Sequence, residues 1–236
     1  MHWVLMHDDN IQRVTGVDRA LTAYTWNELQ SVKVKSIPEY RRWKCLEGVC
    51  ENNPAQWKCV DPPCPGNPGP YGDWMMANMY TGDPQPIGEL EAMLTFAHKN
   101  KLMVEIDVKN GDMQTLVNVV EKTKMMSNVF FCPWEWQHAV EIRRASKAAS
   151  IYIACDSGGC IDTAQSLPAQ GVAIRWNNGD PEHNLNRMRQ IVDAGLGAHV
   201  YEVDLPGDLE ALKNSGIPCS FDTNSPKLGH AKMQRL

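Results

Sequence analysis

The chain has 236 residues, of which 43% are hydrophobic and 22% are charged, and its formal net charge is −5. This composition is typical of a folded globular protein and excludes a disordered or collagen-like chain. The acidic balance, without a block of about five or more like charges, argues against DNA or RNA as a partner. No apolar run reaches the roughly 18 residues of a membrane-spanning helix, so no transmembrane segment is expected.

The chain opens with an apolar segment, WVLMH, that we predict to be a β-strand, and polar residues follow it. The first residues lack the basic region and the long apolar core of a signal peptide, so either the protein stays inside the cell or its natural start is missing. His7 stands at the carboxyl end of this strand, where barrels and open parallel sheets carry their reactive groups. A single histidine at such a position is more commonly structural than catalytic.

Residues 38–86 form a segment rich in cysteine and proline, with nine of the fifteen prolines and four of the eight cysteines. These cysteines have the spacing C-x4-C-x8-C-x4-C, at Cys45, Cys50, Cys59 and Cys64. We interpret the pattern as disulfide stapling of a segment that cannot build its own core, which favours an oxidising compartment and a secreted protein. A zinc site and ordinary buried thiols remain alternatives.

From residue 87 onward, helical and strand patterns alternate along the chain. Strands separated by helices of about ten residues imply parallel pairing, because each crossover must return the chain to the same end of the sheet. The predicted helices cover residues 87–99, 112–123, 137–148, 161–167, 182–195 and 207–216. The predicted strands cover residues 102–108, 128–132, 150–155, 171–176, 198–203 and 218–222.

With the opening segment, this pattern gives seven predicted strands, which suit either a closed barrel or a doubly wound sheet. No G-x-G-x-x-G motif follows a strand, and the cluster DSGGC is too short to hold a dinucleotide. A dinucleotide-binding fold is therefore disfavoured.

The stretch KLMVEIDVKNG places Glu105, Asp107 and Lys109 at every second position of a predicted strand. Side chains alternate between the two faces of a strand, so the three ionisable groups share one face and the valine and isoleucine residues share the other. On an exposed strand the charged face would lie in water. In a barrel it would point into the interior.

Taken in order, these segments resemble the glycerophosphodiester phosphodiesterase family. VLMHDDNIQRVTG is similar to the strand-His-Asp segment of that family, and YTWNELQSV to its t-x-x-E-L stretch. PIGELEAMLTFAHKNKLMVEIDVK is similar to its next helix and the I-E-x-K strand, and VDAGLGAHVYEVDLPGDLEALKNSGIPCSFDTNSP to its ending. The resemblance covers nearly the whole chain except about residues 38–86.

The resemblance implies a fold and a reaction. The fold is an α/β, TIM-type (β/α) barrel over residues 1–236, incomplete at its N-terminus, with residues 38–86 as a Cys/Pro-rich insertion loop. The reaction is metal-dependent hydrolysis of glycerophosphodiesters, which are lipid head-group phosphodiesters, to glycerol phosphate and an alcohol.

The resemblance also implies roles for single residues. His7 matches one of the two acid/base histidines of the family, and Lys109 matches the lysine that approaches the phosphate. Asp107 matches the metal-binding carboxylate, with Asp in place of Glu, and such a ligand suits Mg²⁺ or Ca²⁺. Glu105, on the same face, is expected to be a second metal ligand or a partner of Lys109.

On the substrate side, Tyr201 stands where the family has a tryptophan, and Trp134 follows a predicted strand. We expect both to bind substrate, with packing at the rim as the alternative for Trp134. The histidines His138, His183 and His199 lack partners at metal-binding spacing and are expected to be at the surface or structural.

The departures from the family suggest a weak or inactive enzyme. The opening His-Arg-Gly and Glu-x-Asp segments of the family, which supply a second histidine and two metal ligands, have no counterpart here. Losing an acid/base group lowers a rate by a factor of about 10² to 10⁴.

Two other functions remain open: a non-catalytic barrel relative that binds a ligand or partner, and a phospholipase D of the spider-venom type. The expected partner is a small-molecule phosphodiester. The methionine-rich segment WMMANMY, residues 74–80, is a candidate for contact with a lipid surface, and filling of core gaps is the alternative.

Overall fold

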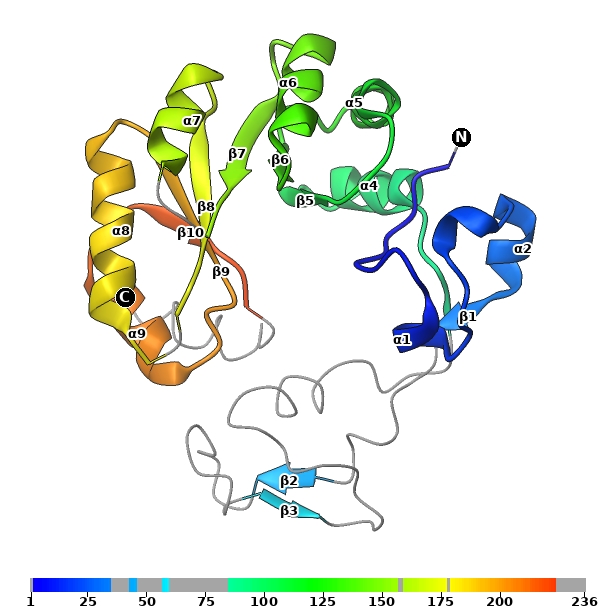
Figure 1. Cartoon of the computed structure of the whole chain (residues 1–236), viewed down its shortest axis with the longest axis horizontal. Helices are drawn as coiled ribbons and strands as arrows, with labels where there is room; N and C mark the ends of the chain where they lie inside the picture. The colour runs from blue at the N-terminus through cyan, green and yellow to red at the C-terminus, as the bar shows by residue number, and fades with distance from the viewer. Residues whose placement is uncertain are drawn as a thin grey trace. The chain divides into compact units, whose positions relative to one another are not determined.

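In a computed structural model of the protein, the structure describes residues 2–34, 85–156, 159–177 and 179–223, and the backbone of two short strands at 43–45 and 57–59. The chain divides into two compact units (Figure 1). The sheet unit comprises Met1–His7, Gly88–Val203 and Glu210–Asp222. The small unit comprises Asp8–Ile87, Asp204–Leu209 and Thr223–Leu236.

The sheet unit is built on a parallel sheet whose order is β10-β9-β8-β7-β6-β5 among the described residues. Every neighbouring pair is parallel, as the helical crossovers predict. The sheet forms a half-barrel, so the prediction of an incomplete TIM-type α/β barrel is confirmed. The strands are β5 (Val104–Val108), β6 (Val129–Pro133), β7 (Ser150–Ala154), β8 (Gly171–Arg175), β9 (Gly197–Tyr201) and β10 (Cys219–Phe221).

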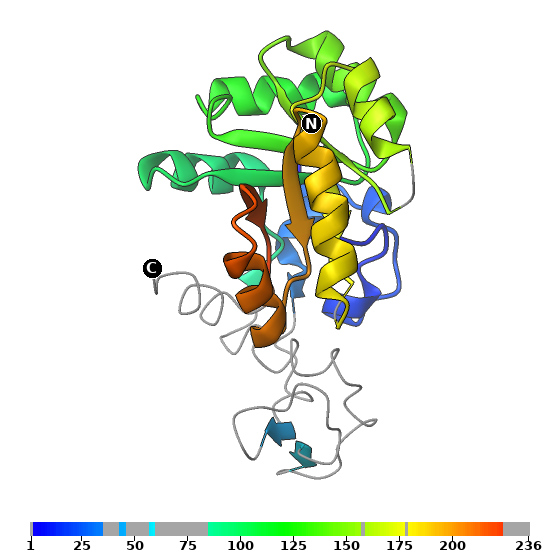
Figure 2. The same ribbon diagram turned by 90° about the vertical axis from the view of Figure 1, so that its left-hand side faces the viewer.

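Helices follow the strands and cover the outer face of the sheet, as the view from the side shows for α8 next to β9 (Figure 2). Apolar side chains on both layers are fully buried, and each contributes about 1.5–3 kcal/mol relative to an exposed position. They include Leu94, Val117, Ile142, Phe131 and Val172. The helices are α4 (Leu90–Lys99), α5 (Met113–Lys122), α6 (Trp136–Ala145), α7 (Cys160–Ser166), α8 (Pro181–Asp193) and α9 (Pro206–Asn214).

Local sequence signals set where two of these helices begin and one ends. The Asp112 side chain accepts hydrogen bonds from the backbone N–H groups of Gln114 and Thr115 and caps α5. Asp180 caps α8 in the same way, with Pro181 at its first position. After α8, Gly195 has a φ of 77°, which glycine adopts easily, so the predicted stop at this residue is confirmed.

The opening segment is not a seventh strand of the parallel sheet, so that prediction is wrong. Val4 and Glu89 form an isolated antiparallel bridge, and the Leu5 N–H donates to the Gly88 carbonyl at 2.8 Å. The Trp3 indole Nε1 donates to Thr115 Oγ1 at 3.1 Å. The segment therefore pairs with the chain just before α4 and with α5, because its backbone and indole groups find partners there.

The small unit contains α1 (Gln12–Thr15), the 3₁₀ helix η1 (Leu21–Ala23), α2 (Trp26–Ser31) and two short antiparallel pairs. Thr25 and Glu28 form a reciprocal capping box at the start of α2. The pairs are β1 (Lys33–Val34) with β4 (Gln85–Pro86), and β2 (Trp43–Cys45) with β3 (Trp57–Cys59). The predicted insertion 38–86, apart from these strands and residues 85–86, lies outside the described residues, as does segment 74–80.

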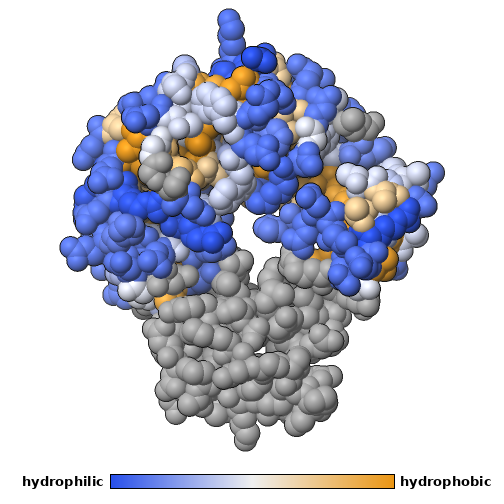
Figure 3. Space-filling view, viewed as in Figure 1, coloured by the Kyte–Doolittle hydropathy of each residue, from blue (hydrophilic) through white to orange (hydrophobic). Residues whose placement is uncertain are grey.

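The described surface is largely hydrophilic on the face in Figure 3, with hydrophobic patches between the polar regions. The exposed large apolar side chains include Phe96, Met103, Trp134 and Trp136. Among the described residues, no helix is both long and apolar enough to cross a bilayer.

The inner face of the sheet carries small residues beside one large ring. Gly171 on β8 and Gly197 on β9 are paired in register, and the Tyr152 ring of β7 packs against both. A Cβ atom on Gly171 would overlap the Tyr152 ring and the carbonyl oxygen of Gly197. Only glycine leaves room for this ring at these two positions.

We therefore expect Gly171→Ala to lower the free energy of unfolding by about 1–3 kcal/mol, because the Tyr152 ring and the β9 backbone must shift to make room. Urea unfolding measured by circular dichroism tests this. Gly207→Ala is the matched control, since a Cβ there meets no atom within 4 Å. Equal unfolding midpoints for the two variants would contradict the packing described here.

Candidate functional site

The charged face of β5 is the inner face of the sheet. The register pairs Asp107 with Cys132, and Ala173 with His199, so alternate residues on every strand project to the same side. Glu105 on β5 contacts His199 on β9 across this side, although three strands separate β5 from β9 in the sheet. The interior orientation predicted for this charged face is thus observed for Glu105.

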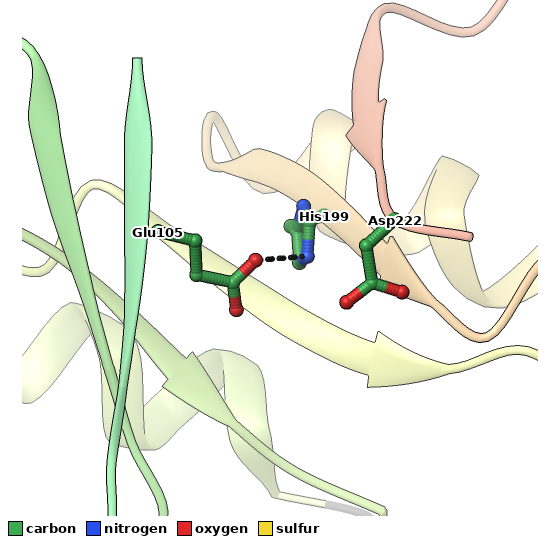
Figure 4. Close-up of side chains that lie close together, drawn as sticks. All are labelled: Glu105, His199 and Asp222. Atoms are coloured by element: carbon green, nitrogen blue, oxygen red, sulfur yellow. Dashed lines mark ion pairs between the residues drawn. The ribbon is translucent and has the colours of Figure 1, made fainter. Parts of the chain in front are cut away.

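Three side chains form what we call the interior cluster: Glu105, His199 and Asp222. One ligand atom from each lies within 4.8 Å of the other two, and among the described residues no other set of three or more such groups meets this condition. His199 Nε2 lies 3.0 Å from Glu105 Oε2. Figure 4 shows the carboxylates of Glu105 and Asp222 on either side of the His199 ring.

The His199 ring is held from two directions. Its Nδ1 atom lies 2.9 Å from Ser220 Oγ on β10. The His199 and Phe130 rings pack edge to face, with 5.3 Å between their centroids. The side chain is only 2% exposed. The contact of Nε2 with Glu105 is within ion-pair distance but is not aligned as a hydrogen bond, and Nε2 has no hydrogen-bond partner.

Asp222 is fixed by the backbone where β10 ends. Its carboxylate accepts a hydrogen bond from the Glu202 N–H at 2.6 Å. Its own N–H donates to the Val200 carbonyl at 2.9 Å, and its carbonyl accepts from the Val203 N–H at 3.1 Å. The side chain is exposed, and its carboxylate and backbone are each held by the hydrogen bonds given above.

Cys132 on β6 lies next to the interior cluster as a free, buried thiol. Burial raises its pKa first, and the nearby carboxylates of Glu105 and Asp107 raise it further, because each disfavours a thiolate. The thiol is also within hydrogen-bonding reach of Glu105. Cys132 is therefore a protonated, unreactive group at ordinary pH.

A second set of side chains lies toward the carboxyl ends of the strands, and we call it the rim group: Asp107, Lys109, Trp134, Asp156, Arg175 and Tyr201. Lys109 Nζ lies 2.7 Å from Asp107 Oδ2. The Trp134 indole Nε1 donates to Asp107 Oδ1 at 3.0 Å, and Lys109 Nζ is 5.3 Å from the Trp134 ring centre. Both carboxylate oxygens of Asp107 are thus already bound, one by Lys109 and the other by Trp134.

Tyr201 connects the other half of the rim group. Its hydroxyl donates to the Asp156 carboxylate, and its ring packs edge to face with Trp134 at 5.8 Å. The Arg175 guanidinium lies 5.6 Å from the ring centre and 3.5 Å from Glu202. Burial and the bond to Asp156 both raise the pKa of Tyr201. The Tyr201 ring therefore contacts both Trp134 and Arg175.

The sequence-predicted residues are thus found in three places. Asp107, Lys109, Trp134 and Tyr201 lie together in the rim group, and Glu105 lies deeper, in the interior cluster. His7 is exposed, follows the segment that pairs with residues 88–90, and is not a member of the interior cluster.

His199 and Asp222 were missed by sequence reasoning, and the prediction that His199 is a surface or structural residue did not foresee its contact with Glu105. Neither residue lies at metal-binding spacing from another ligand in the sequence. Both meet Glu105, which is about 100 positions earlier in the chain, only because the sheet curls. The alternation of His199 and Tyr201 along β9 was the available signal, since Tyr201 was expected to bind substrate and residues two apart on a strand share one face.

The cysteines differ from one another. Cys155, just after β7, and Cys160, the first residue of α7, form a disulfide, and Cys132 and Cys219 are free. The side chains of Cys45, Cys50, Cys59 and Cys64 lie outside the described residues, so the predicted stapling of the insertion stays a prediction.

The fold and the two groups of inward side chains define the class of protein: an α/β protein built on a half-barrel, with carboxylates and a buried histidine on the inner face of its sheet. Its sequence matches the Glycerophosphoryl diester phosphodiesterase family over residues 1–221. The chain belongs to this family, as the resemblance predicted. A comparison with curated protein sequences found no match.

Solved structures agree with the fold. A glycerophosphodiester phosphodiesterase from Agrobacterium tumefaciens is similar with a TM-score of 0.66 and 14% identity, covering 97% of this chain and 80% of that one. One from Parabacteroides distasonis gives 0.64 and 13%, covering 98% and 77%. A phosphodiesterase from Oleispira antarctica, in complex with the product sn-glycerol-3-phosphate, gives 0.61 and 13%, covering 98% and 78%.

We expect iodoacetamide at pH 8 to label Cys219 faster than Cys132 in the folded protein, because Cys132 is 3% exposed and Cys219 is only partly buried. Peptide mapping by mass spectrometry follows each site separately. Unfolding in urea should make the two rates similar. Faster labelling of Cys132 in the folded chain would show that the inner face of the sheet is open to reagents at this position.

Proposed function

We propose that the chain hydrolyses glycerophosphodiesters, releasing glycerol phosphate and an alcohol, and that it does so weakly. The family and the solved relatives support a hydrolase of this type. The observation that carries the proposal for this chain is the rim group, where Lys109 lies beside Asp107 and Trp134 at the carboxyl end of β5.

The rim group has the parts that a phosphodiester needs. Lys109 supplies a positive charge for a phosphoryl oxygen, at the end of the sheet where barrel enzymes bind their substrates. Arg175 supplies a second positive charge beyond Tyr201. Trp134 and Tyr201 offer aromatic rings next to the two cations, against which a head group can pack.

Substrate binding must compete with contacts inside the rim group. The Lys109 ammonium is paired with Asp107 at 2.7 Å, so a phosphate oxygen has to share or replace this partner. An ion pair that is partly exposed is worth only about 0–1 kcal/mol, so the exchange is not costly. The side chains of Lys109 and Asp107 are 29% and 43% exposed, which leaves both within reach of a substrate.

Metal dependence, with Mg²⁺ or Ca²⁺ at Asp107, is part of the proposal and follows from the family resemblance. Such ions take about six to eight oxygen ligands, including several carboxylates or carbonyls. Both oxygens of Asp107 are already bound by Lys109 and Trp134, and among the described residues no cluster of ligands includes Asp107. The described rim group therefore does not fit a hard cation by itself, and this is one reason to expect weak activity.

His7 is the proposed acid/base group, because it matches a catalytic histidine of the family and is exposed. A general acid or base must come within hydrogen-bond reach of the proton that it moves. A chain with one such histidine would protonate the leaving alcohol or activate the attacking water, but would perform the other transfer poorly. The expected loss is a factor of about 10² to 10⁴.

Product analysis distinguishes this proposal from the alternatives. Glycerophosphocholine gives glycerol phosphate and choline by simple hydrolysis, while a lysophospholipid substrate turned over to free choline would indicate a phospholipase D. Binding of the same compounds without turnover would indicate a non-catalytic relative. A rate close to that of complete family enzymes, dependent on added metal, would contradict the proposal of weak activity.

We also propose that the protein is secreted. The disulfide between Cys155 and Cys160 supports this, because disulfides persist in oxidising compartments and are rare in the cytosol.

Lys109→Met should lower kcat/KM for glycerophosphocholine by a factor of about 10² or more, because a positive charge aimed at the phosphoryl oxygens is lost. The measurement is a coupled assay for glycerol phosphate at high enzyme concentration. Lys122→Met is the matched control, since Lys122 pairs with Glu91 and is 67% exposed. Equal losses in both variants would remove Lys109 from the site.

Trp134→Ala should raise KM by about 2- to 30-fold for a substrate with a cationic head group, the range that corresponds to one cation–π contact. Trp136→Ala is the control, because Trp136 lies two residues further on and is exposed to a similar extent, 45% against 40%. A substrate with an uncharged head group should show a smaller difference. An unchanged KM for Trp134→Ala with both substrates would leave this ring as rim packing only.

A further inference from the structure

We propose that the interior cluster of Glu105, His199 and Asp222 binds one divalent transition-metal ion of the Zn²⁺ type. This site shares Glu105, the expected second metal ligand, with the sequence-based prediction, but it excludes Asp107 and adds His199 and Asp222, for which no metal role was predicted. It uses ligands from three strands, β5, β9 and the end of β10. The ion would connect the two edge strands of the described sheet.

The donor set indicates the class of metal. One imidazole nitrogen and two carboxylates are ligands that Zn²⁺ and its first-row neighbours accept in four-coordinate sites. Mg²⁺ and Ca²⁺ prefer all-oxygen shells with more ligands. The single imidazole therefore favours a borderline ion over a hard one.

His199 is prepared as a ligand. Its Nδ1 atom is already in contact with Ser220 Oγ at 2.9 Å, a second contact that typically fixes the orientation of a metal-binding histidine. Its Nε2 atom is buried, has no hydrogen-bond partner, and lies between two carboxylates. A buried nitrogen without an aligned hydrogen-bond partner costs free energy, and a metal ion at this position would remove that cost.

The charge of the cluster also calls for a cation. Glu105 and Asp222 bring two carboxylates to one imidazole. Lys109 is paired with Asp107 and does not offset this charge. Two carboxylates held close together repel one another, and a divalent ion between them offsets the repulsion directly.

The geometry is close to that of a bound site. In a tetrahedral zinc site, neighbouring ligand atoms are about 3.3 Å apart, given metal–ligand distances near 2.0–2.1 Å. His199 Nε2 and Glu105 Oε2 are 3.0 Å apart, and all three ligand atoms lie within 4.8 Å of one another. Asp222 is the exposed member of the set.

Metal binding should be measured on the full chain after removal of metal by chelation. Isothermal titration with ZnCl₂ should give about one site of this kind, and excess Mg²⁺ should not compete for it. Asp222→Asn and His199→Gln should each weaken binding about 100-fold or more, and Ser220→Ala about 10- to 100-fold, the range seen for second contacts of ligating histidines. Asp107→Asn is the matched control and should leave the affinity unchanged.

Two further readouts separate this site from the cysteines. Co²⁺ in place of Zn²⁺ should give a visible spectrum without the near-ultraviolet charge-transfer band of thiolate ligands, and this spectrum should be lost in Asp222→Asn. Zn²⁺ should also raise the melting temperature of the chain, but not that of the variant. Asp222 is exposed, so this variant is expected to fold even if His199→Gln does not.

Several results would overturn the proposal. Binding that persists unchanged in Asp222→Asn, or that is lost in Asp107→Asn instead, would place the ion elsewhere. A strong thiolate band would assign the metal to cysteines. Absence of Zn²⁺ and Co²⁺ binding by the folded chain would leave Glu105 and His199 as a simple ion pair.

Discussion

The strong curl of the parallel sheet is the constraint on which the site depends, and the contact between Glu105 and His199 is its direct result. The two residues belong to β5 and β9, and they meet at 3.0 Å only because the strands between them curl strongly. Small residues on the inner face permit this curl: Gly171 and Gly197 accept the Tyr152 ring, and Ala173 is paired with His199. The helices on the outer face supply the apolar burial that holds the curled sheet together.

The same alternation of side chains along β5 produces two chemically different groups. Glu105 and Asp107 are two residues apart on one face, and a strand rises about 3.3 Å per residue, so they lie at different depths. Asp107 is surrounded by Lys109 and Trp134 and is accessible to substrate. Glu105 faces a buried imidazole instead. The single strand β5 thus contributes Asp107 to the rim group and Glu105 to the more protected interior cluster.

The sequence predicted most of the sheet unit and part of the site. Helix and strand positions after residue 87 were predictable because periodicity, the caps and Gly195 report local structure. The opening segment was not, since an apolar strand pattern does not tell which backbone it will pair with. His199 and Asp222 escaped for a similar reason: their meeting with Glu105 depends on how far five strand pairs curl, which no local pattern specifies.

The sheet, as far as the chain is described, has β5 at one edge and β10 at the other, with six strands between and including them. An arc with two free ends can widen or narrow, unlike a ring. The span from Glu105 to Asp222 measures that opening, so whatever occupies it is thermodynamically linked to the curvature. A ligand that draws β5 and β10 together should favour a more strongly curved sheet. Strain that moves these two strands apart should weaken the binding of that ligand. Because the two effects are reciprocal, the curvature of the half-barrel would depend on the ligand bound between Glu105 and Asp222, and the affinity for that ligand would depend on the curvature.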